Sequence, residues 1–111
     1  MLTIRKTGEG YYLASLTGEK EELGRNDCHL MKKDLMAVLK PHREITISMK
    51  GVKSITAGGI HILEELKHAA DARKCKIRFI NAEPSVAPVL AELTQKKAQQ
   101  HNTLEIDELF Q

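Results

Sequence analysis

The sequence predicts an α/β domain with a mixed sheet of four or five strands and with helices packed mainly on one side. Apolar residues recur at every second position in some segments, as in strands, and at every third or fourth position in others, as in helices. After an initial pair of strands, helix and strand segments alternate, which is typical of this class. With 111 residues, the chain can bury a core without a metal ion or a disulfide. We therefore expect one domain over residues 1–111.

Residues 1–17 are expected to form a β-hairpin. The segments 2–7 and 11–17 have the composition of strands. Gly8 and Gly10 lie between them and permit the positive φ angles of a tight turn. The two strands should therefore pair in the antiparallel direction.

A first helix is expected over residues 20–40 and a third strand over residues 44–50. Pro41 ends the helix because proline has no backbone N–H with which to continue it. The apolar side chains of the helix recur at steps of three, four and three residues: Cys28, Met31, Leu35 and Val38. Those of the strand alternate with polar ones: Ile45, Ile47 and Met49. Each pattern predicts one buried face.

A second helix is expected over residues 59–74, a fourth strand over residues 76–80, and a third helix after it. The third helix begins at Pro84 or at Pro88, because proline is tolerated in a first helical turn, and the sequence leaves both starts open. The predicted apolar stripes are Ile60, Leu63, Leu66 and Ala70 in the second helix, and Val86, Val89, Leu90 and Leu93 in the third. Residues 103–111 predict either a short edge strand or a C-terminal tail.

Charge and composition exclude several classes of protein. The formal net charge is +2, from 17 Lys and Arg against 15 Asp and Glu, which is too small for the long-range field of a nucleic-acid-binding protein. No apolar run approaches the ~20 residues of a membrane helix, and the N-terminus lacks the apolar block of a secretory signal. We therefore expect a cytoplasmic protein, no nucleic acid and no direct membrane insertion. Cys28 and Cys75 have no paired spacing and are expected as reduced thiols.

The sequence shows no arrangement of residues typical of an enzyme. Cys28 and His29 are neighbours, but neighbouring side chains of a helix point to different faces. The densest basic cluster, residues 73–78, begins at a helix end, where the dipole favours cations, and continues along a strand as a solvated surface. We expect neither catalysis nor a cofactor.

The stretch from Gly51 to Leu63 is the most informative part of the chain, because it joins an apolar strand to an amphipathic helix through two glycines. A strand-to-helix turn of this kind lies at the carboxyl edge of an open sheet, where partners and ligands bind. Gly58 and Gly59 are expected to leave backbone N–H groups accessible at the positive end of the helix dipole, which favours an anion. Neither a P-loop nor a Gly-x-Gly-x-x-Gly motif is present, which argues against specific nucleotide binding. A nucleotide or small-anion sensor is therefore only an alternative function.

The exposed side of the second helix is expected to bind a protein partner. His61, Glu65 and His68 follow one another at helical spacing, with Glu64 beside them. Such a stripe could hold a metal ion, but a helix face rich in charge is more typical of a solvated or protein-binding surface, and we expect no metal. Thr56 directly precedes the helix, which favours a role as its N-cap.

The order of elements and the turn Ser-Ile-Thr-Ala-Gly-Gly-Ile resemble the STAS domain of bacterial anti-sigma factor antagonists, over about residues 10–95. In that family an apolar strand ends in a bend, and Asp-Ser-x-Gly followed by an aliphatic residue begins the second helix. Here Thr56 stands at the Asp position, Ala57 at the Ser position, and Gly59 and Ile60 at the glycine and the aliphatic residue. The resemblance implies a STAS-like fold for the single domain.

The departures from the family pattern concern its phosphorylation site. In the antagonists that are switched, a partner kinase phosphorylates the serine, whereas Ala57 has no hydroxyl. Ser48 also replaces an acid that the family often has in the third strand, although Gly18 and Asn81 stand where it tends to have a glycine and an asparagine. The resemblance thus implies a module that is not switched at this position, with nearby Thr56 as the candidate phosphoacceptor.

The function that the resemblance implies is a non-catalytic, protein-binding regulatory module. Its partner would be an anti-sigma factor or a kinase-like ATPase. Relatives without the serine imply an alternative, a small cytoplasmic subunit of a lipid-transport ABC ATPase, and a homodimer stays open. The expected partner-binding residues are Ser54, Thr56, Ala57, Gly58, Gly59, His61, Glu64, Glu65 and His68.

Overall fold

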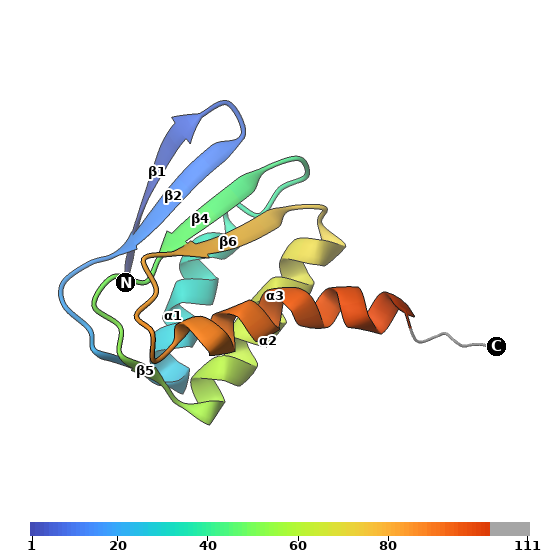
Figure 1. The fold of residues 1–111 in the computed structure, drawn as a ribbon. Coiled ribbons are helices and arrows are strands. Elements are labelled where there is room, and N and C mark those ends of the chain that lie inside the picture. The colour runs from blue at the N-terminus through green and yellow to red at the C-terminus, as the bar shows by residue number, and fades with distance from the viewer. Residues whose placement is uncertain (103–111) are drawn as a thin grey trace.

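The computed structural model describes residues 1–102, which form a mixed four-stranded sheet with three helices on one face (Figure 1). The sheet has the strand order β1-β2-β4-β6, and a separate pair, β3 and β5, lies at one end. The strands are β1 (Leu2–Gly8), β2 (Tyr11–Leu16), β3 (Glu22–Leu23), β4 (Glu44–Ser48), β5 (Ser54–Ile55) and β6 (Lys76–Ile80). The helices are α1 (Arg25–Met36), α2 (Ala57–Ala72) and α3 (Ala87–Asn102). The predicted fold class is confirmed.

The hairpin at the N-terminus is confirmed, and the rest of the main sheet is parallel. β1 pairs with β2 in the antiparallel direction, whereas β2 with β4 and β4 with β6 are parallel. Of the two glycines at the hairpin turn, Gly10 has a positive φ of +80°. Since β2, β4 and β6 run the same way, their amino ends meet at one edge of the sheet and their carboxyl ends at the other.

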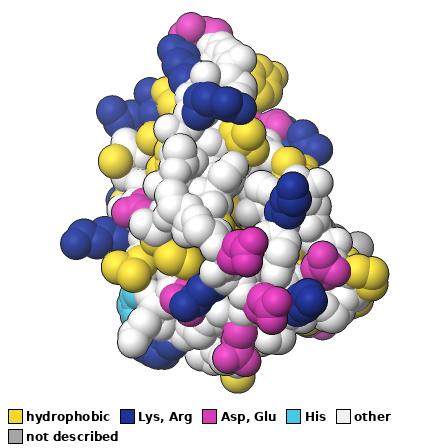
Figure 2. All heavy atoms as spheres, turned by 90° about the vertical axis from the view of Figure 1, so that its left-hand side faces the viewer, with side chains coloured by type: hydrophobic (Ala, Val, Ile, Leu, Met, Phe, Trp, Pro, Cys, Tyr) yellow, Lys and Arg dark blue, Asp and Glu magenta, His cyan; other side chains and the backbone are white. Residues whose placement is uncertain are grey.

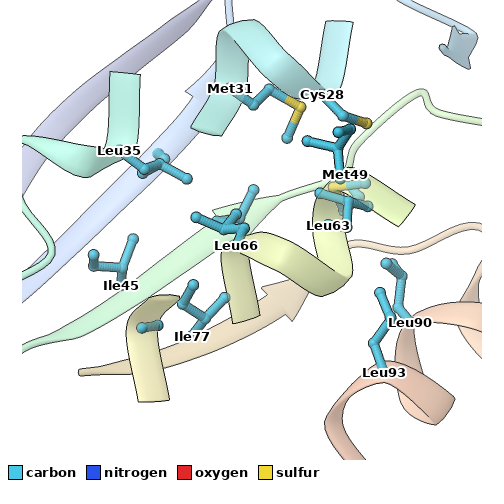
Figure 3. Packing of buried hydrophobic residues seen from close by; sticks show 14 of the residues in the cluster. Cys28, Met31, Leu35, Ile45, Met49, Leu63, Leu66, Ile77, Leu90 and Leu93 are labelled. Atoms are coloured by element: carbon cyan, nitrogen blue, oxygen red, sulfur yellow. The ribbon is translucent and has the colours of Figure 1, made fainter. Parts of the chain in front are cut away.

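The core lies between the sheet and the three helices. Ile45 and Ile47 are fully buried on the helix side of β4, whereas the alternating Thr46 is only half-buried on the open side. Side chains of all three helices meet this inner face (Figure 3). Burying each large aliphatic side chain contributes roughly 1.5–3 kcal/mol, so this cluster holds the helices against the sheet.

The first helix is shorter than predicted. α1 begins at Arg25 instead of residue 20, because Leu23 is buried as part of strand β3 and Gly24 adopts the extended conformation of an N-cap. The Asp27 carboxylate accepts a hydrogen bond of 2.9 Å from the Gly24 backbone N–H, which is one half of a capping box, since Gly24 has no side chain to supply the other half. The helix ends at Met36, before the expected end at residue 40, and its predicted stripe is buried except for Val38, which is half-buried.

Two boundaries around the second helix also differ from the prediction. β4 ends at Ser48 rather than residue 50, and α2 begins at Ala57, two residues earlier than expected. The helix ends at Ala72 rather than residue 74, because Lys74 has a left-handed φ of +57°. Of its predicted apolar stripe, Leu63, Leu66 and Ala70 are buried and Ile60 is half-buried, and Ile62, which was not predicted, is buried as well.

The third helix begins close to Pro88 and not at Pro84, the two starts that the sequence left open. Pro88 is the second residue of α3, and Pro84 lies in the turn before it. Of the predicted stripe Val89 is half-buried, whereas the other three side chains are buried. The expected edge strand or tail at residues 103–111 lies outside the described residues. Within the described part of the chain, no helix combines the length and apolar character needed to cross a membrane.

Candidate functional site

The turn between β5 and α2 is fixed to the segment that precedes α1. β5 pairs with β3 in the parallel direction, so that Ser54 lies opposite Glu22. The backbone N–H of Ser54 donates to the Glu21 carbonyl at 3.1 Å, and that of Thr56 donates to the Leu23 carbonyl at 2.9 Å. This turn together with residues 57–59, hereafter the corner, is therefore held by backbone hydrogen bonds between segments about 30 residues apart in sequence.

Thr56 is the N-cap of α2, as predicted. Its backbone is extended, and its side-chain oxygen accepts a hydrogen bond of 3.1 Å from the Gly59 N–H. Its carbonyl accepts the first helical hydrogen bond, from Ile60, at 2.9 Å. The Thr56 side chain is half-buried. The hydroxyl oxygen that sequence reasoning named as the candidate phosphoacceptor thus satisfies a backbone donor of the helix.

Gly59 allows α2 to approach the beginning of α1 closely. A Cβ atom at this position would lie 2.9 Å from the Leu23 carbonyl oxygen and 3.2 Å from the Cys28 sulfur. Gly59 is buried and its N–H is bonded to Thr56, so the expectation of an accessible N–H at this glycine is wrong. Gly58 is half-buried, and a Cβ there would lie 3.1 Å from the Arg25 Cβ. Close packing against β3, β5 and α1 explains Gly59, and packing against α1 explains Gly58.

The two cysteines are buried, and both are free. Burial raises the pKa of the Cys28 thiol to about 11, with a smaller contribution from the nearby Asp27 carboxylate. Burial also raises the pKa of Cys75. Cys28 lies under the corner as a neutral packing group rather than a nucleophile.

The exposed side of the corner has a small apolar centre and polar neighbours. Ser54 and Ala57 are exposed, and the Ser54 hydroxyl lies 3.5 Å from a Glu22 carboxylate oxygen. Ala57 is the first residue of α2, and its methyl group faces solvent. The structure thus brings the predicted residues 54, 56 and 57 to one surface.

On α2, the predicted stripe is partly engaged in an ion-pair network. One Glu65 oxygen lies 3.2 Å from Lys32 of α1, and the other lies 3.2 Å from the His61 imidazole. The Lys32 ammonium is the main reason why the pKa of Glu65 lies below its ordinary value. His61 and His68 are exposed, and Glu64 is half-buried. Among the described residues, no group of three or more His, Cys, Asp or Glu could hold a metal ion.

A hollow of about 540 Å³ lies beside the corner, at the carboxyl ends of β2 and β4. Its charged residues carry both signs, and Lys20 pairs with Asp27 at 3.3 Å while Lys53 pairs with Glu21 at 3.9 Å. Figure 2 views this side of the molecule and shows acidic and basic side chains interspersed in its lower half. The hollow is lined by Ser15, Leu16, Gly18, Glu19, Lys20, Glu21, Ser48, Lys50, Gly51 and Lys53. We call it the carboxyl-end hollow.

Comparison with known families decides the identity of this fold. The family model of the STAS domain matches residues 14–105, which is most of the chain. The chain belongs to the STAS domain family. No protein of curated function matches its sequence significantly.

Solved structures support the same fold at low sequence identity. The anti-sigma factor antagonist SpoIIAA in its unphosphorylated form has a TM-score of 0.61 and 11% identity, over 91% of this chain and 96% of that one. The Bacillus cell fate determinant SpoIIAA in the phosphorylated form has a TM-score of 0.55 and 12% identity, over 94% and 85%. A structure of Mglu has a TM-score of 0.61 and 13% identity over 74% of this chain, which spans only 20% of that larger protein. STAS domains of this kind are regulatory rather than enzymatic.

Sequence reasoning missed the α1 side of the corner in this STAS domain. Glu22, Arg25 and Lys32 contact or face residues of the β5–α2 segment from about 33 positions earlier in the chain. Their sequence pattern is that of an ordinary solvated helix. Only the strand pair β3–β5 brings the two segments together, and two-residue strands leave no periodicity from which to predict it.

Proposed function

We propose that this STAS domain is a non-catalytic, protein-binding regulatory module of the anti-sigma factor antagonist type. Family membership and the fold shared with SpoIIAA support this class of function. The proposal places the partner, an anti-sigma factor or a kinase-like ATPase, on the corner and on the exposed side of α2. It also places the module in the cytoplasm and treats residues 1–111 as one domain.

Ala57 is the observation that carries the rest of the proposal. It is exposed at the start of α2, where the family's motif has the phosphorylated serine, and its methyl group cannot accept a phosphoryl group. Thr56 does not replace that serine, because its hydroxyl caps the helix and is half-buried. The module therefore binds its partner without a phosphorylation switch at this position.

The partner surface has two parts with different roles. Ser54, Ala57 and Gly58 form its centre, and the buried Gly59 and the Thr56 cap give that centre its shape. The second part is charged and lies one to three helical turns further along α2. It comprises His61, Glu64, Glu65 and His68. A small apolar centre with a polar rim is the usual composition of a protein interface.

A capture experiment with two matched variants tests this proposal. Ala57→Glu places a charge in the centre of the surface, and a glutamate is favourable in the first turn of a helix, so folding is retained. Ala91→Glu makes the same change on an exposed position of α3. We expect the wild type and A91E to capture a kinase-like ATPase or anti-sigma factor from the native cytoplasm, and A57E to lose it. Equal capture by all three proteins would refute the corner as the site.

Two alternative functions predict other results, the first in the same capture experiment and the second in a thermal-shift measurement. A subunit of a lipid-transport ABC ATPase would capture an ATPase together with its membrane permease. A nucleotide or small-anion sensor is favoured by the carboxyl-end hollow, with its lysines beside the corner. That sensor would show a thermal shift with nucleotides that Lys50→Gln and Lys53→Gln abolish. If phosphate is found on Thr56 after incubation with cellular kinases, the proposal of an unswitched module is wrong.

A further inference from the structure

A second hollow, of about 370 Å³, lies at the opposite edge of the sheet, where the parallel strands begin. Three loops surround it: the β1–β2 turn, the loop from α1 to β4, and the loop from α2 to β6. Its volume falls within the range of small-molecule sites, roughly 300–1,000 Å³. It is lined by Glu9, Gly10, Tyr11, His42, Arg43, Glu44, Lys74 and Lys76. We call it the amino-end hollow.

Backbone hydrogen bonds between the three loops fix the shape of the amino-end hollow. The His42 N–H donates to the Lys74 carbonyl at 3.0 Å, and the Glu44 N–H donates to the Gly10 carbonyl at 2.8 Å. His42 and Lys74 have positive φ angles of +65° and +57°, which are uncommon for residues with a side chain. Their backbone is thus held in place by its neighbours, and the hollow is formed without a ligand.

The two acidic groups of this hollow form ion pairs with residues outside it. The Glu44 carboxylate lies 3.2 Å from Arg78, and the Glu9 carboxylate lies 3.6 Å from Lys6. Neither Arg78 nor Lys6 lines the hollow. The basic residues that line the hollow form no ion pair with either carboxylate within the described residues, although Glu44 stands opposite Lys76 in the strand register.

The basic groups of the hollow are differently constrained. The Arg43 guanidinium is held by a hydrogen bond to the Val38 carbonyl at 3.4 Å and lies 4.8 Å from the centre of the Tyr12 ring. His42, Lys74 and Lys76 are exposed, and within the described residues none of them has an ion pair. One held guanidinium and three uncommitted basic side chains thus surround one concave space.

A helix dipole does not account for this arrangement. Lys74 lies just beyond the end of α2, where a cation is favoured, but Lys76 is already in β6 and His42 lies six residues beyond the end of α1. Tyr11, on the rim, is 54% exposed, which is unusual for so large an apolar side chain. Among the described residues, Tyr11 and Leu30 are the large hydrophobic side chains that are exposed, and Tyr11 lines the amino-end hollow.

We propose that the amino-end hollow is a binding site for a phosphate-bearing ligand with at least two negative charges. Lys74, Lys76 and Arg43 neutralise the phosphate oxygens, His42 donates a further hydrogen bond, and the Tyr11 ring packs against the rest of the ligand. The ligand is either a soluble phosphate ester or a lipid phosphate headgroup, which share this chemistry. The site lies at the far edge of the sheet from the corner, so both can be occupied together.

Titration calorimetry with three probes tests the site and distinguishes its ligands. The probes are inorganic pyrophosphate, ATP, and vesicles of equal parts phosphatidylcholine and phosphatidic acid, each at neutral pH and low salt. Binding of pyrophosphate or ATP identifies a soluble ligand, and binding of vesicles alone identifies a headgroup. Added salt should weaken the binding, because exposed charges are screened. No binding of any probe would overturn the proposal.

Two exposed lysines and one matched control locate the binding. Lys76→Gln and Lys74→Asn each remove one charge, and asparagine tolerates the left-handed backbone at position 74. Each should weaken the Kd about tenfold, the usual effect of losing one charge-assisted hydrogen bond. Lys33→Gln makes the same change at an exposed position of α1 that lines neither hollow, and it should leave the Kd unchanged. If K33Q weakens binding as much as K76Q, or if neither lysine of the amino-end hollow matters, the site is wrongly placed. Circular dichroism of each variant confirms that it is folded.

Discussion

The two ends of the parallel strands differ in how their polar groups are used. At the carboxyl ends, the Thr56 hydroxyl, the Gly59 N–H and the Ser54 N–H all bond to other parts of the same chain. At the amino ends, Lys74 and Lys76 line a hollow and have no ion-pair partners among the described residues. The corner is therefore a surface whose shape is fixed by internal packing, whereas the amino-end hollow is a fixed frame that presents charge. Substitutions in the corner should therefore change the free energy of unfolding more than substitutions in the amino-end hollow.

The largest effect is expected at Gly59, where the corner depends on close packing. Gly59→Ala places a methyl group 2.9 Å from a backbone carbonyl oxygen that cannot move without disturbing β3. We expect it to lower the free energy of unfolding by about 2–3 kcal/mol, as overpacking does. Urea denaturation measures this difference.

Gly58→Ala is the matched control for that substitution. Its added methyl meets the Arg25 Cβ at 3.1 Å, and the helix propensity of alanine offsets that crowding by up to about 1 kcal/mol. We therefore expect a change of less than about 1 kcal/mol. If the two variants were equally stable, close packing at Gly59 would not be what shapes the corner.

Thr56 tests the hydrogen-bonded part of the corner. Thr56→Ala removes the acceptor of the Gly59 N–H and should lower the free energy of unfolding by about 1 kcal/mol. Thr56→Ser retains the hydroxyl and should recover most of the loss. Thermal unfolding of both variants measures the difference. A threonine that is replaced by alanine without cost would be free for modification, and the proposal of an unswitched corner would lose its second support.

Asp27 tests the neighbouring cap through its dependence on pH. The Gly24 N–H is the main reason why the pKa of Asp27 is lowered from its ordinary value of 3.8, with a further contribution from Lys20. A lowered pKa means that the ionised form stabilises the folded state above pH 3.8 and that this contribution disappears as the pH falls through the folded-state pKa. Asp27→Asn should therefore cost about 0.3–1 kcal/mol at neutral pH.

Measuring the stability of both proteins at several pH values is the control for the Asp27→Asn prediction. The stability of the wild type and of D27N should converge as the pH falls below the lowered folded-state pKa of Asp27, because both side chains are then neutral in the folded protein. Denaturation at several pH values, from neutral to strongly acidic, measures the convergence. A difference that stays constant over the series would show that Asp27 acts through its shape and not through its charge.

Local signals predicted much of this fold, whereas non-local contacts were not predictable. The Thr56 cap and the alternation around Ile45 and Ile47 depend on neighbouring residues, and both are confirmed. The start of α1 was misplaced because β3 is only two residues long and has no alternation of its own. The reason for Gly59 also lay outside the local sequence, since the atoms that exclude a side chain there belong to Leu23 and Cys28.

The same distinction applies to the two candidate sites. The corner was predictable as a continuous motif, but its partners Glu22 and Lys32 come from a segment that only folding brings near. The basic cluster 73–78 was interpreted as solvated because its residues were considered alone. His42 and Arg43, some 30 residues earlier, line the same hollow as Lys74 and Lys76, and no periodicity links the two segments. The lining residues come from three separate loops, so only the folded structure brings them around one hollow.

The smallest effect on stability is expected in the amino-end hollow, and there a small effect is itself informative. Lys76 is exposed and has no ion pair within the described residues, so Lys76→Gln removes no stabilising contact and should change the free energy of unfolding by less than about 0.5 kcal/mol. Lys76 stands opposite Glu44 in the β4–β6 register and lines the same hollow as Lys74 and Arg43, so attraction and repulsion oppose each other and the change should stay small at low salt and shrink further when salt is added. Urea denaturation at two salt concentrations measures both values. A clear loss of stability in K76Q would mean that the lysine has a structural partner, and the basic groups of the hollow would then need no ligand to explain them.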